Sequence, residues 1–193
     1  MVEIGEAVRA RPAQIERYGA VAQAFHWLIA ALILFMLGLG YYMEDLPLGL
    51  RKLQLYNLHK SIGISIAMLA ALRLLWRLLH PPPPLPTGMR CWERKAAGVV
   101  HALLYLMLFV QPLVGFLQSN AVSFPVVLWG LVPLPPLIGP DERLGETLLT
   151  VHTVGGNFLA LLVILHVGAA LRHHFVLKDD VLRRMLPGPA AHR

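Results

Sequence analysis

Four long apolar stretches constrain this chain more than any other feature. They cover about residues 24–43, 59–79, 97–118 and 147–171. About 20 apolar residues are enough for a helix to cross the hydrocarbon core of a bilayer. Of the 193 residues, 56% are hydrophobic and only 15% are charged, which is too little charge to cover a soluble domain. The sequence therefore predicts an all-α fold, an integral membrane four-helix bundle.

The segment before the first span and the cysteine count exclude other classes of protein. The approach RARPAQIERYGAVAQ is polar and contains arginines, and no short apolar segment with a cleavage site precedes the span. We therefore expect no removable signal peptide. Cys91 is the single cysteine, and no CxxCH stretch occurs. An internal disulfide and a covalent c-type haem are thereby excluded.

The distribution of basic residues predicts the orientation in the membrane. Before span one and after spans two and four lie Arg9, Arg11, Arg17, Arg77, Arg90, Arg94, Lys95, Arg172, Lys178, Arg183, Arg184 and Arg193. The opposite loops carry Arg51, Lys52 and Arg143 beside several acids. The positive-inside rule then puts both termini in the cytoplasm. This topology accounts for the net charge of +6, so we expect no nucleic-acid partner.

Prolines mark two connections that cannot be spans. HPPPPLPTG at 80–88 predicts a stiff extended cytoplasmic linker, because proline lacks the backbone donor that a helix needs. The apolar stretch 123–145 contains five prolines. With Trp129 and Phe124 it is predicted to be a loop at the outer interface of the membrane, where aromatic rings are enriched.

Histidines on all four spans are predicted to form two layers. By depth, His59 and His152 belong to an outer layer, whereas His26, His101 and His166 belong to a cytoplasmic layer. The fourteen residues between His152 and His166 correspond to about 21 Å along a helix and to nearly the same face, about 40° apart. Ionisable groups inside a membrane usually face the bundle interior and have a function there.

Three interpretations of these histidines compete. A single membrane histidine often serves only as a hydrogen-bond partner between helices. Zinc usually recruits a third and a fourth ligand, but the outer layer offers two histidines and no acid within the helices. A b-type haem needs only two axial imidazoles. Gly63, Gly155 and Gly156 could leave room for the edge of such a ring or could simply allow close helix packing.

Cations near the histidines are candidates to neutralise haem propionates. Arg73 follows His59 by fourteen residues, which puts it at the cytoplasmic layer, where it could bind a propionate or extend to the interface. Lys60 could serve the outer haem or lie among lipid headgroups. We expect interfacial positions for the remaining pair His173 and His174 and no role for His80 and His192.

Several stretches together resemble the bacterial cytochrome b561 family over about residues 17–188. They are AFHWLIAALIL, NLHKSIGISIAMLAALRLLWR, HALLYLMLFVQPLVGF, the His152 to His166 spacing and HHFVLKDDVLRRMLPG. The resemblance implies a bundle with two b-type haems, ligated by His26 with His166 and by His59 with His152. It leaves His101 outside the ligand set. Residues 1–16 form an extension that the resemblance does not cover, and 189–193 form a tail.

The resemblance also implies a function in the bacterial inner membrane. It indicates a multi-pass superoxide oxidase that takes electrons from superoxide at the periplasmic face and reduces ubiquinone. No catalytic side chain is expected, because the haem performs the chemistry. Arg51, Lys52 and Lys60 would attract an anion at the outer face, but Glu44 and Asp45 oppose them.

Two other functions remain open. One is a haem-b membrane anchor subunit that relays electrons between a dehydrogenase or hydrogenase and the quinone pool, and that has a soluble redox partner. The other is a structural or transport bundle without haem, which does not explain two layers of histidines.

Overall fold

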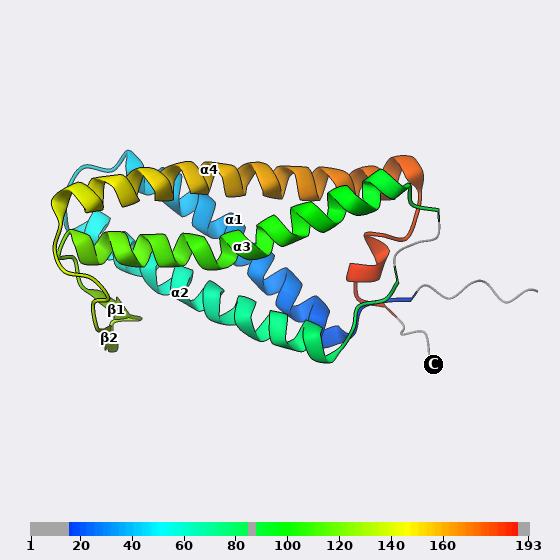
Figure 1. Cartoon of the computed structure of the whole chain (residues 1–193), viewed down its shortest axis with the longest axis horizontal. Helices are drawn as coiled ribbons and strands as arrows, with labels where there is room; N and C mark the ends of the chain where they lie inside the picture. The colour runs from blue at the N-terminus through cyan, green and yellow to red at the C-terminus, as the bar shows by residue number, and fades with distance from the viewer. Residues whose placement is uncertain (1–15, 85–87, 189–193) are drawn as a thin grey trace, which may run out of the picture.

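The computed structural model describes residues 16–84 and 88–188, in which four long helices dominate (Figure 1). They are α1 (Ala20–Glu44), α2 (Leu50–Leu79), α3 (Cys91–Ala121) and α4 (Glu142–Arg172). All four are long and apolar enough to cross a membrane, which confirms the four predicted spans. The predicted extension (apart from Glu16), the tail and His192 lie outside the described residues.

The two ends of the bundle differ in what they carry. At one end, a small β-hairpin lies beside α2; we call this the hairpin end (Figure 1). The first and last described residues both lie at the opposite end, which we call the terminal end (Figure 1). This arrangement follows from four antiparallel helices, because an even number of crossings returns the chain to the side on which it started.

All four helices begin earlier than the hydropathy predicted, and α2 begins earlier by the largest margin. α2 starts at Leu50 rather than at about residue 59, and α4 starts at Glu142 rather than at about residue 147. The Asp141 side chain accepts a hydrogen bond from the Leu144 backbone N–H (2.9 Å), a typical N-cap that satisfies a free donor of the first turn. The hydropathy therefore marked the apolar part of each helix, whereas polar turns extend α2 and α4 beyond it.

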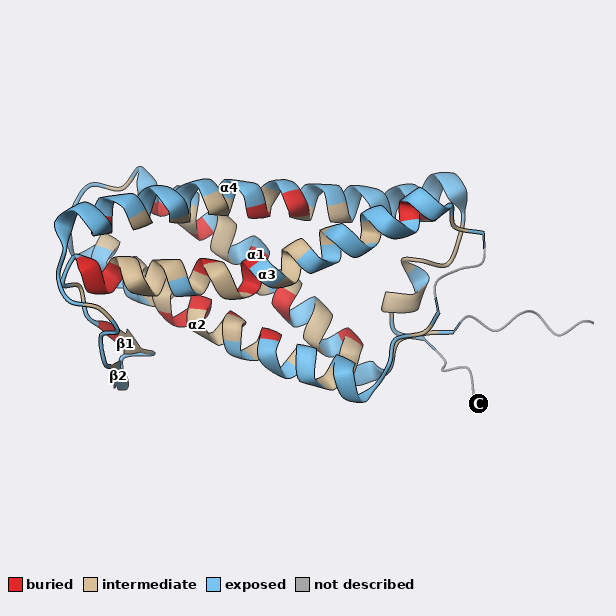
Figure 2. Ribbon diagram, in the orientation of Figure 1, coloured by how far each residue is buried: buried red, intermediate tan, exposed pale blue. Residues whose placement is uncertain are grey.

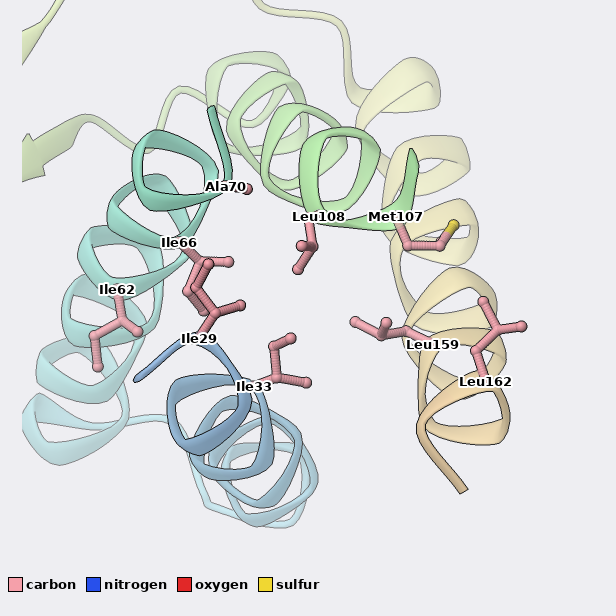
Figure 3. Close-up of a cluster of buried hydrophobic side chains, with 9 residues drawn as sticks. All are labelled: Ile29, Ile33, Ile62, Ile66, Ala70, Met107, Leu108, Leu159 and Leu162. Atoms are coloured by element: carbon pink, nitrogen blue, oxygen red, sulfur yellow. The ribbon is translucent and has the colours of Figure 1, made fainter. Parts of the chain in front are cut away.

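Apolar residues on the inward faces of the helices form a narrow core near the middle of the bundle (Figure 3). The cluster consists of Ile29, Ile33, Ile62, Ile66, Ala70, Met107, Leu108, Leu159 and Leu162. Figure 2 shows that most of the outward helix surface is exposed. Large apolar residues such as Leu34 and Ile164 lie on that exposed surface, as expected for helices that lipid surrounds.

Helix α3 is bent (Figure 1), and Pro112 lies inside it. Proline has no backbone N–H, so the carbonyl four residues earlier, that of Leu108, loses its helical partner, and the proline ring pushes against the preceding turn. A bend in a helix that contains proline is therefore attributed to that residue. The bend changes the path of α3 along α4, its main neighbour.

Within the loop that the sequence predicted at 123–145, residues 126–134 form a β-hairpin, and the fold as a whole is mostly helical. Strand β1 (Val126–Leu128) pairs antiparallel with β2 (Val132–Leu134), with Val126 opposite Leu134. Trp129 and Gly130 have positive φ values of 55° and 71° in the turn. The prolines prevented a helix, as expected, but the β-branched valines between them favoured strands.

The hairpin is fixed to α2 by two serine hydroxyls. The Trp129 backbone N–H donates to Ser61 Oγ (2.9 Å), and its indole Nε1 donates to Ser65 Oγ (3.2 Å). Ser61 is buried. These bonds satisfy polar groups that would otherwise be costly in an apolar environment.

The chain returns to α1 after the fourth span. A π-helical turn, η1 (His173–Leu177), and a short 3₁₀ helix, η2 (Arg183–Met185), follow α4. The Arg17 side chain donates to the carbonyls of Arg183 (2.9 Å) and Leu186 (2.8 Å), and the Trp27 indole donates to the Met185 carbonyl (2.8 Å). Main-chain acceptors after η1 thus bind Trp27 of α1 and Arg17, which lies just before α1.

Candidate functional site

His59 of α2 and His152 of α4 lie next to each other toward the hairpin end and form the hairpin-end pair. Their ring centroids are 6.1 Å apart, at an interplanar angle of 74°. The Nδ1 atoms of both rings are buried and have no hydrogen-bond partner among the described residues. An unpaired buried polar atom costs about 1–3 kcal/mol. The pair therefore has unused bonding capacity.

A cavity of about 580 Å³ surrounds the hairpin-end pair. Residues from all four helices and β1 line it, and this volume is within the range of small-molecule sites. Gly63 and Gly156 are part of its wall. Gly155 is not part of the wall, and a Cβ there would overlap the side-chain amide of Gln111 on α3. Gly63 and Gly156 thus leave space around the histidines, whereas Gly155 allows close packing of α3 and α4.

His26 of α1 and His166 of α4 form the terminal-end pair. Their ring centroids are also 6.1 Å apart, at an interplanar angle of 71°. His101 of α3 lies beside the same ring, 5.2 Å from the centroid of His166. The fourteen residues between His152 and His166 separate the two pairs by about 21 Å along α4.

Arg73 of α2 reaches the terminal-end pair. Its Nη2 donates to His26 Nδ1 (3.2 Å), and its guanidinium carbon lies 5.4 Å from the centroid of the Tyr105 ring. Arginine has donors only, so His26 Nδ1 is the acceptor in this contact. The side chain therefore lies at the histidine layer rather than extending to the end of the helix.

Lys60, the other predicted cation, lines the cavity at the hairpin end. Its Nζ donates to the Pro125 carbonyl (2.9 Å) and lies 3.6 Å from the centroid of the Phe124 ring. The ammonium group is therefore held by the segment that leads into β1. Its contacts leave it close to the histidine pair without an acidic partner among the described residues.

Both pairs fit a group that needs two axial nitrogen donors. Two imidazoles on opposite sides of one metal, with bonds of about 2 Å, would place their ring centroids about 6 Å apart. Both pairs show 6.1 Å, whereas the 5.2 Å between His101 and His166 is shorter. Among the described residues, no group of three or more His, Cys, Asp or Glu could hold a metal ion. The donor set fits a b-type haem better than zinc.

The histidines outside the spans have structural contacts. His173 is buried, and its Nδ1 lies 2.5 Å from Asp179 Oδ2. The His80 ring stacks on Trp76 with centroids 3.8 Å apart. His174 Nδ1 is buried and has no partner within the described part of the chain. Sequence reasoning missed the His173–Asp179 bond, for which the six-residue separation was the only available signal.

Four membrane-spanning helices with two pairs of histidines on their facing sides are typical of membrane cytochromes b. The sequence model of the family described as prokaryotic cytochrome b561 matches residues 17–188. The chain therefore belongs to the prokaryotic cytochrome b561 family. It is a multi-pass protein of the bacterial inner membrane, and its family consists of electron-transfer cytochromes that bind b-type haem.

Three curated relatives are similar over nearly their full lengths. Cytochrome b561 homolog 2 of Escherichia coli (strain K12) is 37% identical over 175 residues, which cover 89% of this chain and 92% of the relative. The probable superoxide oxidase CybB of Yersinia pestis is 29% identical over 174 residues, 89% of this chain and 97% of the relative. Cytochrome b562 of Cereibacter sphaeroides is 28% identical over 178 residues, 88% and 94% of the two chains.

Proposed function

We propose that this chain carries electrons between two b-type haems, one held by His59 and His152 and the other by His26 and His166. The observation that carries the proposal is the equal 6.1 Å spacing of the two imidazole pairs. Two further features support it: the unpaired Nδ1 atoms of His59 and His152 and the cavity around them. Helix α4 then contributes one ligand to each haem.

The haems would supply one-electron oxidation and reduction, and the side chains of this chain would hold and tune them. Arg73 would neutralise a propionate beside the terminal-end pair, and Lys60 would do the same beside the hairpin-end pair. A cation in a low-dielectric site favours the reduced haem, which carries one positive charge less than the oxidised form. The bulky apolar residues between the pairs would exclude water from the path.

We further propose that the hairpin end faces the periplasm and that both termini are cytoplasmic. The positive-inside rule supports this orientation. Arg77, Arg90 and Arg94 lie toward the terminal end, where α2 ends and α3 begins. The hairpin end would then receive electrons from outside the cell.

The donor in this proposal is superoxide, and the acceptor is ubiquinone. Two superoxide anions each lose one electron and become dioxygen, and one ubiquinone takes up both electrons with two protons to become ubiquinol. The Yersinia pestis relative, a probable superoxide oxidase that is 29% identical to this chain, supports this choice. Arg51, Lys52 and Lys60 toward the hairpin end would attract an anion.

The test is superoxide-dependent reduction of a ubiquinone analogue by the purified chain in detergent. We expect reduction that superoxide dismutase abolishes and that His152→Ala eliminates. Two haems per chain without this activity would contradict the superoxide proposal. That result would favour the anchor-subunit alternative, in which a soluble dehydrogenase or hydrogenase supplies the electrons. One haem or none per chain would contradict the two-haem proposal itself.

A further inference from the structure

The His152 ring lies against the backbone of α3 at a position without a side chain. A Cβ built on Gly115 would lie 3.0 Å from His152 Cε1 and 3.2 Å from its Nδ1. Ordinary contacts between non-bonded carbon atoms are about 3.5–4.0 Å. Any side chain at residue 115 would therefore have to displace the imidazole or push the two helices apart.

Among the described glycines, Gly115 is the one at which a Cβ would come this close to a histidine ring. Gly40 of α1 faces the other ring of the pair, but a Cβ there would lie 3.7 Å from His59 Cε1, an ordinary contact distance. A Cβ at Gly98, also on α3, would meet nothing within 4 Å. The three positions thus form a graded series. Only at residue 115 would an added Cβ crowd a histidine ring.

The contact with Gly115 also determines which nitrogen of the His152 ring faces α3. Gly115 follows Pro112 by three residues in the bent helix α3. A Cβ on Gly115 would lie nearer to His152 Nδ1 (3.2 Å) than to its Nε2 (3.7 Å), so Nδ1 is the ring nitrogen that faces α3. His152 Nδ1 is buried and has no hydrogen-bond partner at bonding distance among the described residues. The second ring N–H of a metal-binding histidine is usually turned toward a neighbouring part of the protein, which fixes the rotation of the ring.

We propose that Gly115 is a positioning residue for His152. The missing side chain allows the imidazole to lie on α3 with Nδ1 toward this helix, which leaves Nε2 to bind the haem. The inference rests on the proposed function, in which His152 is a ligand of the hairpin-end haem. It adds a residue that sets the place and rotation of the ligand without contacting the haem iron.

The contact should matter most when haem is bound. In a haem-free chain, the ring could yield by a few tenths of an ångström to accommodate an alanine methyl group. A haem on the opposite side would prevent this movement, because the imidazole would then be fixed from both sides. Changes in residues that orient a metal ligand typically cost about 10–100-fold in metal affinity.

The experiment compares Gly115→Ala and Gly115→Leu with the matched control Gly98→Ala on the same helix. The measurements are haem per chain, the midpoint potential of each haem and the electron paramagnetic resonance spectrum, which reports the relative rotation of the two imidazoles. In Gly115→Ala we expect about 10-fold weaker binding of the hairpin-end haem and a changed resonance signal. Gly115→Leu should lose this haem and keep the terminal-end haem. Gly98→Ala should match the wild type.

If a variant retains the terminal-end haem, that retention will show that the variant folds. If both Gly115 variants keep two haems with wild-type potentials and spectra, the inference is wrong. Equal loss of both haems would also overturn it, because that pattern indicates general helix packing. His152→Ala is measured in parallel. If His152→Ala keeps the hairpin-end haem, the ligand assignment itself fails; if it loses that haem while the Gly115 variants are normal, only the positioning role fails.

Discussion

The two histidine pairs have the same spacing but different surroundings. The hairpin-end pair lies in a cavity whose wall contains glycines, and both of its rings approach the backbone of a neighbouring helix. The terminal-end pair is contacted by polar side chains instead: Arg73 bonds to His26, and His101 lies beside His166. One site is shaped mainly by the absence of side chains, and the other mainly by charge and hydrogen bonding.

This difference has a consequence for how each site can be perturbed. A site with glycines in its wall is sensitive to added side-chain volume, because packed interiors have little free space. A site with a neighbouring guanidinium responds to removed charge, because electrostatic interactions are strong where water is excluded. Volume changes should therefore affect the hairpin-end pair, whereas charge changes should affect the terminal-end pair.

The largest expected effect is the loss of one haem when one ligand is removed. His59→Ala and His152→Ala should each lose the hairpin-end haem, and His26→Ala and His166→Ala should each lose the terminal-end haem. Each of these variants would leave only one of the two histidines that would hold the haem. Reduced-minus-oxidised spectra and haem-to-protein ratios measure the loss.

His101→Ala is the matched control for the ligand variants, because His101 lies in the same layer but at 5.2 Å from His166. It should retain both haems. Full haem content in any of the four ligand variants would contradict the assignment of that residue. Loss of a haem in His101→Ala would mean that the terminal-end site uses a different pair.

A smaller effect is expected from Arg73→Leu. Removal of the positive charge beside His26 should destabilise the reduced haem and lower the midpoint potential of the terminal-end haem. We expect a shift on the order of 60 mV, which corresponds to a tenfold change for a one-electron couple. The hairpin-end potential should change little, because the two pairs are about 21 Å apart along α4. An optical redox titration that resolves the two haems measures both values.

Arg73→Lys keeps the charge and serves as the control. Its terminal-end potential should remain closer to that of the wild type than the potential of Arg73→Leu does. Equal shifts of both haems in Arg73→Leu would refute a local role for this residue and would indicate a change in the whole bundle.

The sequence predicted those features that depend on distance along a single helix. Four apolar stretches predicted four spans, which the structure confirms. The fourteen residues between His152 and His166 predicted two layers, and the structure brings His59 to His152 and His26 to His166. These inferences succeed because helix geometry fixes rise and rotation per residue. The role of the four histidines as ligands stays a prediction.

The features that the sequence did not predict depend on contacts between helices or on local folding of loops. The distance from Gly115 to His152 depends on how the bent helix α3 crosses α4, which no residue pattern specifies. The sequence analysis did not predict the hairpin after α3, because the prolines there indicated a loop. The valines of β1 and β2 nevertheless form strands. The His173–Asp179 bond requires the turn η1, which brings two residues together that follow the apolar span.

The smallest expected effect concerns the attachment of the hairpin to α2. Ser61→Ala removes the acceptor of the Trp129 backbone N–H, which should cost about 1 kcal/mol because a hydrogen bond is lost at a buried position. Phe124 and Val126 line the cavity, so a loosened hairpin should weaken retention of the hairpin-end haem and leave the terminal-end haem unchanged. The temperature at which each of the two haems is lost during thermal unfolding measures this difference. Ser123→Ala, an exposed change in the segment before the hairpin, is the control. An equally early loss of both haems in Ser61→Ala would mean that the hairpin stabilises the bundle as a whole rather than the cavity beside it.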